Sequence, residues 1–147
     1  MSTVRLHRVF TAPPERVFKA FIHPDALASW LPPYGFVCQV HALDARPEGT
    51  FKMSFLNFST GNSHSFGGAY LEFEPGKRLK YNDRFDDPHL PGEMITTVTF
   101  TAVSCGTELH ITQEGIPEVI PAEMCYLGWQ ESLEKLKKLV EPNVPDA

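Results

Sequence analysis

The chain has 147 residues, a formal net charge of −5 at pH 7 and 42% hydrophobic residues. This length predicts one domain that buries a core without disulfides or a structural metal. The negative charge, with no basic patch along the sequence, disfavours nucleic acid and anionic membranes as partners.

The cysteines and the first residues indicate where the protein resides. Cys38, Cys105 and Cys125 are odd in number and widely spaced, so they do not form a disulfide framework. The first ten residues contain no apolar stretch of signal-peptide length, and no segment is long enough to insert into a membrane. We therefore expect a soluble protein in a reducing cytoplasm.

The first part of the chain predicts one strand followed by two short helices. Residues 3–10 are typical of a strand, which Pro13 and Pro14 end. Residues 15–22 carry apolar side chains at helical spacing. The next residue precedes a proline, which disfavours α-helical backbone and ends this helix. A second short helix is expected over residues 24–30.

The middle of the chain predicts six strands. From residue 36 onward apolar and polar side chains alternate, as in half-buried strands. One expected inward face comprises Gly67, Ala69, Leu71 and Phe73. Breaker-rich turns separate the strands at residues 44–49, 59–65, 75–76, 86–92 and 105–106. Such successive hairpins predict an antiparallel sheet.

The only long segment with helical periodicity spans residues 121–140. A helix with a single apolar stripe needs a sheet to lie on. The sequence thus predicts an α+β fold with a curved seven-stranded antiparallel sheet around this helix, in one domain over residues 1–147 with a loose tail at 142–147. Such curvature leaves a space under the helix. The stripe comprises Ala122, Cys125, Tyr126, Trp129, Leu133, Leu136 and Val140.

The order of these elements, with the residues at their joints, resembles the START-like (SRPBCC) superfamily, whose fold is the helix-grip. Within it, the chain resembles the family of the activator of Hsp90 ATPase homologue 1. In that family two glycines usually follow the arginine-proline of the second segment, and here Glu48 replaces the first. The segments that carry the resemblance are VFTAPPERVFKAFIHPDALASWL (9–31), DARPEG (44–49), GGAYLEFEPGKRLKY (67–81), GTELHITQEGIP (106–117) and LGWQESLEKL (127–136).

A set of mostly apolar residues is expected to face the space between sheet and helix. They form either the lining of a ligand pocket or an ordinary packed core, and these alternatives differ only in packing density. The candidate ligand-binding residues are Trp30, Phe51, Met53, Phe55, Tyr81, Asp83, Phe85, Met94, Thr96, Gln113, Cys125 and Trp129.

Asp83 is the most unusual of these candidates, because a carboxylate in a dry core needs a partner or water. If it faces a pocket, Asp83 can hold a ligand hydroxyl or act as a base, and Tyr81 is the other weak catalytic candidate. Alternatively Asp83 lies in solvent, or the strand register is shifted by one residue. If the register is shifted, Asn82 and Arg84 point inward instead of Asp83.

No metal site or cofactor is predicted. The six histidines are scattered, and the sequence contains neither a His-x-x-x-His nor a Cys-x-x-Cys motif. His110 is expected to face solvent, since its neighbours in the strand point inward. Gly67 and Gly68 lie inside a strand, so we interpret them as a bulge or a close packing contact, not as a phosphate loop.

The start of the long helix carries apolar residues opposite its stripe. Met124 and Leu127 are expected to be covered by the loop at 86–92, by a second copy of the chain in a homodimer, or to form a mobile cap at the pocket mouth. Gly128 suggests the close approach of a strand or a local bend.

Three functions follow from the residues and the resemblance. The first is binding of a hydrophobic or aromatic small molecule without defined catalysis. The second is a cavity enzyme of the polyketide cyclase or hydrolase type. The third, implied by the family resemblance, is a co-factor of an Hsp90-type chaperone ATPase. It ranks last, because the sequence contains no additional segment that would grip a large partner.

Overall fold

The computed structural model describes residues 2–146, which form one seven-stranded sheet and three helices. Neighbouring strands are all antiparallel, in the order β1-β7-β6-β5-β4-β3-β2, which confirms the predicted α+β, helix-grip-like architecture. The elements are β1 (Ser2–Phe10), α1 (Pro14–Ile22), α2 (Pro24–Trp30), β2 (Phe36–Leu43), β3 (Thr50–Asn57), β4 (Ser63–Glu74), β5 (Arg78–Phe85), β6 (Met94–Val103), β7 (Gly106–Ile116) and α3 (Ala122–Val140).

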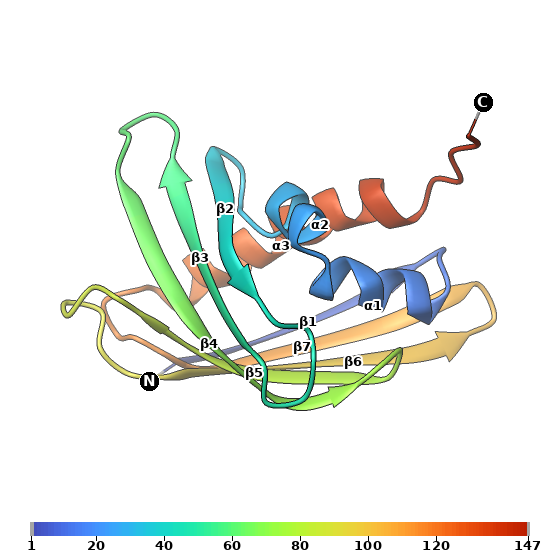
Figure 1. Ribbon diagram of the computed structural model, residues 1–147, viewed down its shortest axis with the longest axis horizontal. Helices are drawn as coiled ribbons and strands as arrows, with labels where there is room; N and C mark the ends of the chain where they lie inside the picture. The colour runs from blue at the N-terminus through green and yellow to red at the C-terminus, as the bar shows by residue number, and fades with distance from the viewer. Residues whose placement is uncertain (1, 147) are drawn as a thin grey trace.

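The sheet is strongly curved, and the helices lie on its concave side. In Figure 1, β2, β3 and β4 rise steeply, whereas β1, β6 and β7 run along the base of the molecule. The long helix α3 crosses the concave side, and the C-terminal residues extend beyond it.

Two glycines allow close backbone approach in β4. A Cβ atom on Gly68 would lie 1.7 Å from the Asn82 carbonyl oxygen, and one on Gly67 would lie 2.7 Å from the Phe51 carbonyl oxygen. No other residue fits there without moving the neighbouring strand. The expected close packing contact is therefore confirmed.

The inward face of β4 differs from the prediction. Phe66 and Tyr70 are buried, whereas Leu71, expected on the inward face, is 49% exposed. The pairing register with β5 shifts between Tyr70 and Glu72. This irregularity changes which side chains face inward along the strand.

The packed core fills one end of the concave side. Leu133, Leu136 and Val140 of α3 are almost fully buried, as are Val17 and Phe18 of α1. In contrast, the first turns of α3 are exposed on one face. Met124 is 64% exposed and Leu127 54%, so the expected cover by the loop at 86–92 is wrong.

Tyr126 also departs from the prediction, because it is 41% exposed although it was assigned to the apolar stripe. It lies about 60° around the helix from Trp129, at the edge of the stripe. Gly128 has no strand against it, contrary to expectation. A Cβ atom there would meet only the Pro33 Cβ atom, at 3.8 Å.

Candidate ligand cavity

A cavity of about 390 Å³ lies between the concave face of the sheet and the helices. This volume is within the range of small-molecule sites. The lining is dominated by aromatic and aliphatic side chains from β3, β4, β5 and α3, with few polar groups. The space under the first half of α3 is therefore not filled by the core.

Most of the residues predicted from the sequence line this cavity. They come from strands β3, β5, β6 and β7 and from the inward face of α3. They are Phe51, Met53, Phe55, Tyr81, Asp83, Phe85, Met94, Gln113, Cys125 and Trp129.

Two predicted residues, Trp30 and Thr96, lie outside the lining. Trp30 is completely buried between the two short helices, where its indole N–H donates to the Ala20 carbonyl at 2.8 Å and its ring packs on Phe21. Thr96 is also completely buried, and its hydroxyl accepts a hydrogen bond from Gln113 at 3.4 Å. Trp30 thus belongs to the core, and Thr96 supports a lining residue.

Other lining residues were not predicted. Phe66 and Tyr70 are absent from the prediction, because the expected inward face of β4 is the one that carries Gly67. Two large aromatic residues four positions apart in this strand are a sequence signal that the opposite face is buried. Of the remainder, Phe36 begins β2 and His64 lies in β4, and the others come from helices and loops whose position depends on tertiary packing. The full set is Phe21, Leu27, Leu31, Pro33, Phe36, His64, Phe66, Tyr70, Leu90, Ile120, Met124, Gly128 and Ser132.

Asp83 is the exceptional polar residue of the lining. It is 6% exposed, whereas Arg84 points to solvent, so the register with Asp83 inward is the correct one. Among residues 2–146, its Oδ1 is the one buried side-chain oxygen or nitrogen that lacks a hydrogen-bond partner. Burial is the main cause that raises the pKa of Asp83 to about 7, and the nearby Glu93 carboxylate contributes to this rise. Near neutral pH, Asp83 can therefore either donate or accept a hydrogen bond.

Tyr81 lies two residues before Asp83 on the same face of β5. Its ring meets Phe51 edge-on, with ring centres 5.6 Å apart. Burial raises the pKa of Tyr81 far above its ordinary value, and Asp83 adds to this effect, while a hydrogen bond with Thr96 opposes it. The phenol is therefore neutral at physiological pH, and it is a poor base.

A hydrogen-bonded chain joins α3 to the sheet across the cavity floor. The Trp129 indole N–H donates to Gln113 Oε1 at 3.0 Å, and Gln113 Nε2 in turn donates to Thr96. These bonds satisfy the polar atoms of Trp129 and Gln113. Among the described lining residues, Asp83 is thus the one with a buried polar side-chain atom that lacks a hydrogen-bond partner.

The cavity opens beside the start of α3. Met124 and His64, both in the lining, are exposed to solvent, and Leu90 from the loop after β5 borders the same space. Within residues 2–146, the cavity contains no cluster of three side chains suited to a metal ion. In the same part of the chain, no helix has the length and hydropathy needed to traverse a bilayer.

Comparison with known proteins gives a family and a fold. The family model described as activator of Hsp90 ATPase homolog 1-like protein matches residues 11–141. Comparison with curated proteins yields no match.

Solved structures match over nearly the whole chain. Protein CV1439 from Chromobacterium violaceum is 62% identical, with a TM-score of 0.95 over 96% of this chain and 98% of its own. The AHSA1 protein from Silicibacter pomeroyi is 22% identical, with a TM-score of 0.79 over 94% and 96%. Protein NE0264 from Nitrosomonas europaea is 23% identical, with a TM-score of 0.77 over 93% and 92%. The last two similarities concern the fold alone.

Proposed function

Because the chain belongs to the family of activator of Hsp90 ATPase homolog 1-like proteins, we propose that it uses the helix-grip cavity to bind a hydrophobic small molecule. The ligand is aromatic or polycyclic and carries one hydrogen-bonding group that meets Asp83. The proposal includes a cytoplasmic location, supported by three cysteines that all remain free.

The observation that carries this proposal is the unpartnered Asp83 oxygen in an otherwise apolar cavity. An unsatisfied buried polar atom costs about 1–3 kcal/mol, and a ligand hydroxyl or amine removes that cost by pairing with it. The aromatic walls then contribute roughly 25 cal/mol for each Å² of apolar ligand surface that they bury.

A pair of cysteine variants tests the cavity directly. Cys125 lines the cavity, so Cys125→Trp is expected to fill it, whereas Cys105→Trp makes the same change on an exposed turn. We expect the uncharged aromatic dye N-phenylnaphthylamine to bind the wild type and Cys105→Trp with increased fluorescence. Cys125→Trp should bind it at least about tenfold more weakly, a loss of about 1.4 kcal/mol.

Native mass spectrometry of freshly purified protein tests for a natural ligand. We expect a non-covalent adduct on the wild type that is absent from Cys125→Trp. Equal dye affinity in the two cysteine variants, with both folded by circular dichroism, would contradict binding in this cavity.

A catalytic alternative rests on the same carboxyl group, because an Asp with a pKa of about 7 suits a general base. Asp83→Asn separates the two functions. In a binding protein the variant weakens the ligand adduct, and no chemical conversion of the bound molecule is seen in either protein. In an enzyme of the cyclase or hydrolase type, the variant retains the bound molecule but no longer converts it.

The family description also supports a chaperone co-factor as a third candidate. Its test is the ATPase rate of purified Hsp90 with and without the protein. A rate that rises equally with wild type and Cys125→Trp would assign the activity to the protein surface, because the cavity variant would be fully active.

A further inference from the structure

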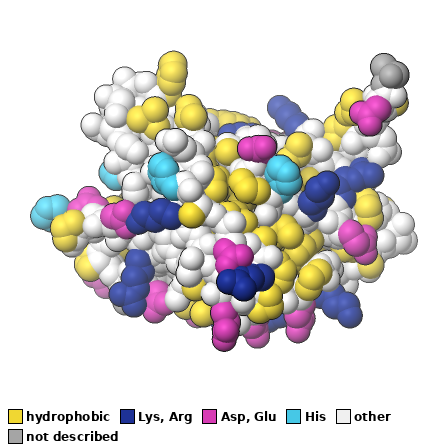
Figure 2. All heavy atoms as spheres, in the orientation of Figure 1, with side chains coloured by type: hydrophobic (Ala, Val, Ile, Leu, Met, Phe, Trp, Pro, Cys, Tyr) yellow, Lys and Arg dark blue, Asp and Glu magenta, His cyan; other side chains and the backbone are white. Residues whose placement is uncertain are grey.

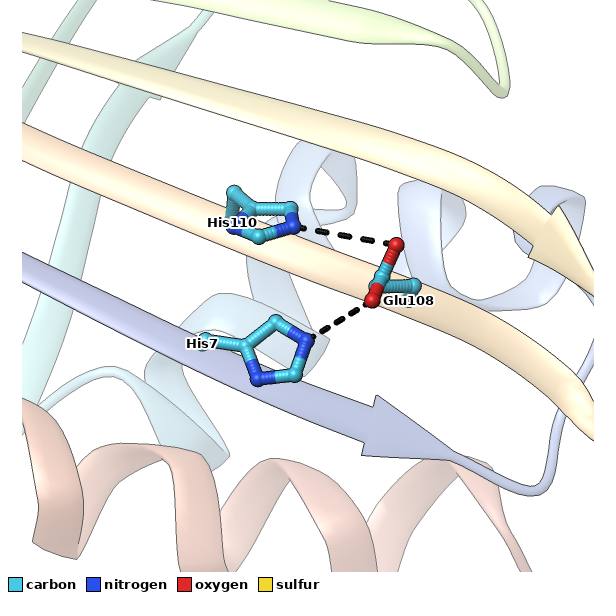
Figure 3. Close-up of side chains that lie close together, drawn as sticks. All are labelled: His7, Glu108 and His110. Carbon is cyan, nitrogen blue, oxygen red and sulfur yellow. Dashed lines mark hydrogen bonds and ion pairs between the residues drawn. The ribbon is translucent and has the colours of Figure 1, made fainter.

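Three side chains of the kind that bind transition metals meet on the outer face of the sheet. His7 Nε2 lies 2.9 Å from Glu108 Oε2, and His110 Nε2 lies 3.7 Å from Glu108 Oε1. Figure 3 shows the two imidazoles on neighbouring strands, each directed toward the carboxylate between them. One ligand atom from each of the three residues can be chosen so that all lie within 4.8 Å of one another.

The pairing of β1 with β7 creates this cluster. His7 is the direct cross-strand partner of His110, and Glu108 precedes His110 by two residues, so it shares the same face of β7. The two rings lie 4.6 Å apart, centre to centre. The helices cover the other side of the sheet, so all three side chains are accessible to solvent, at 52%, 37% and 53% for His7, Glu108 and His110.

Both imidazoles approach the same carboxylate, His7 at Oε2 and His110 at Oε1. An ordinary surface pair explains the contact between His7 and Glu108, but exposed pairs contribute little stability. It does not explain why a second imidazole also approaches the same carboxylate.

We propose that His7, Glu108 and His110 bind a divalent transition metal ion, with Zn²⁺ as the best match. Two imidazole nitrogens and one carboxylate oxygen are ligands that zinc accepts, whereas Ca²⁺ and Mg²⁺ prefer oxygen alone. Ligand atoms around a tetrahedral zinc lie about 3.3 Å apart, given bonds of about 2.0–2.1 Å. The separations of 2.9 Å (His7 Nε2 to Glu108 Oε2) and 3.7 Å (His110 Nε2 to Glu108 Oε1) lie on either side of this value, and one ligand atom from each residue lies within 4.8 Å of the others. A water molecule takes the fourth position.

The site lies on the opposite face from the ligand cavity and is independent of the proposed function. Isothermal titration calorimetry of the full chain with zinc chloride tests it, with expected binding of one ion per chain. His110→Ala and Glu108→Gln should each weaken binding by at least about tenfold, as removal of one of three ligands demands. Cobalt(II) should show the visible ligand-field bands of tetrahedral coordination in the wild type and lose them in both variants.

Two control variants exclude other zinc ligands. His89→Ala removes an exposed histidine from the loop after β5, and Cys105→Ser removes the exposed thiol on the turn before β7. Both should bind zinc as the wild type does. The proposal is overturned if the wild type binds no zinc, if His110→Ala and Glu108→Gln keep wild-type affinity, or if Cys105→Ser loses binding. Circular dichroism without metal checks that each variant is folded.

Discussion

Asp83 carries a free energy cost that depends on pH. Its pKa is about 7 in the folded protein, because it is buried, and near 4 in an unfolded chain. The folded state therefore binds the proton more tightly than the unfolded state does. Its contribution to stability is complete below pH 4 and is lost progressively as the pH rises to 7.

Asp83→Asn should remove this pH dependence. Between pH 4 and 7 we expect the free energy of unfolding of the wild type, relative to the variant, to fall by up to about 1.4 kcal/mol per pH unit. Urea denaturation at pH 4.5, 5.5, 6.5 and 7.5 (about one unit apart, spanning the transition) measures the difference. A difference that stays constant over this range would show that Asp83 titrates normally.

Glu48 adopts a left-handed backbone conformation, with φ of 66°, at the position where the family resemblance leads us to expect glycine. Such a conformation costs a residue with a Cβ atom about 1–2 kcal/mol. Glu48→Gly removes this strain and so stabilises the folded state. The greater conformational freedom of glycine in the unfolded chain offsets about 0.4–1 kcal/mol of that stabilisation. We expect a net stabilisation of about 0.5–1 kcal/mol in thermal or urea denaturation.

Glu48→Ala is the matched control for this change, because alanine keeps the strain while removing the exposed glutamate side chain. Its stability should remain close to that of the wild type. If Glu48→Ala is as stable as Glu48→Gly, the side chain and not the backbone conformation is responsible.

Helix α3 has two halves with different environments. Its second half is anchored by Leu133, Leu136 and Val140 in the core, whereas its first half borders the cavity and is tied to the sheet through Trp129. Gly128 lies in this first half and weakens it, since glycine is about 1 kcal/mol less favourable than alanine within a helix.

Gly128→Ala should therefore raise the free energy of unfolding by up to about 1 kcal/mol, because the added methyl group has room. Gly68→Ala provides the contrast, as its methyl group would overlap the Asn82 carbonyl and force β4 from β5. It should destabilise the protein by several kcal/mol, that is, more than about 3 kcal/mol. If Gly128→Ala lowers the melting temperature instead, the start of α3 needs glycine for a bend that the structure lacks.

At the scale of the whole molecule, the cavity links ligand binding to stability. Figure 2 shows hydrophobic side chains gathered around the middle of the visible face. Met124 and Leu127 are both exposed at the start of α3, and Met124 lines the cavity. A ligand that binds only the folded state stabilises it by about 2.7 kcal/mol at a concentration of 100 times its Kd.

N-phenylnaphthylamine at that concentration should raise the melting temperature of the wild type by roughly 5–10 °C, given about 2–4 °C per kcal/mol for a domain of this size. Cys125→Trp should show no comparable rise, because its cavity is filled. Differential scanning calorimetry measures both. A rise that is equal in the two proteins would place the dye at some other surface.

Local sequence determined the elements and much of the lining. Alternation with a period of two placed Phe51, Met53 and Phe55 on one face of β3, and Tyr81 and Asp83 on one face of β5, as the structure shows. These predictions succeed because strand parity depends only on neighbouring residues. Parity failed in β4, where the register shift and the close backbone approach at Gly68 depend on a neighbouring strand.

Tertiary structure alone decided three features. The sequence could not say whether the space under α3 is empty, because packing density depends on the curvature of the sheet as a whole. It could not show that Asp83 lacks a partner, since any polar group brought close by folding would have satisfied it. Nor could it show that His7 and His110 meet, because these residues are far apart in the chain and come together only through the pairing of β1 with β7. Each depends on contacts between distant segments, whereas periodicity and turn residues report only local ones.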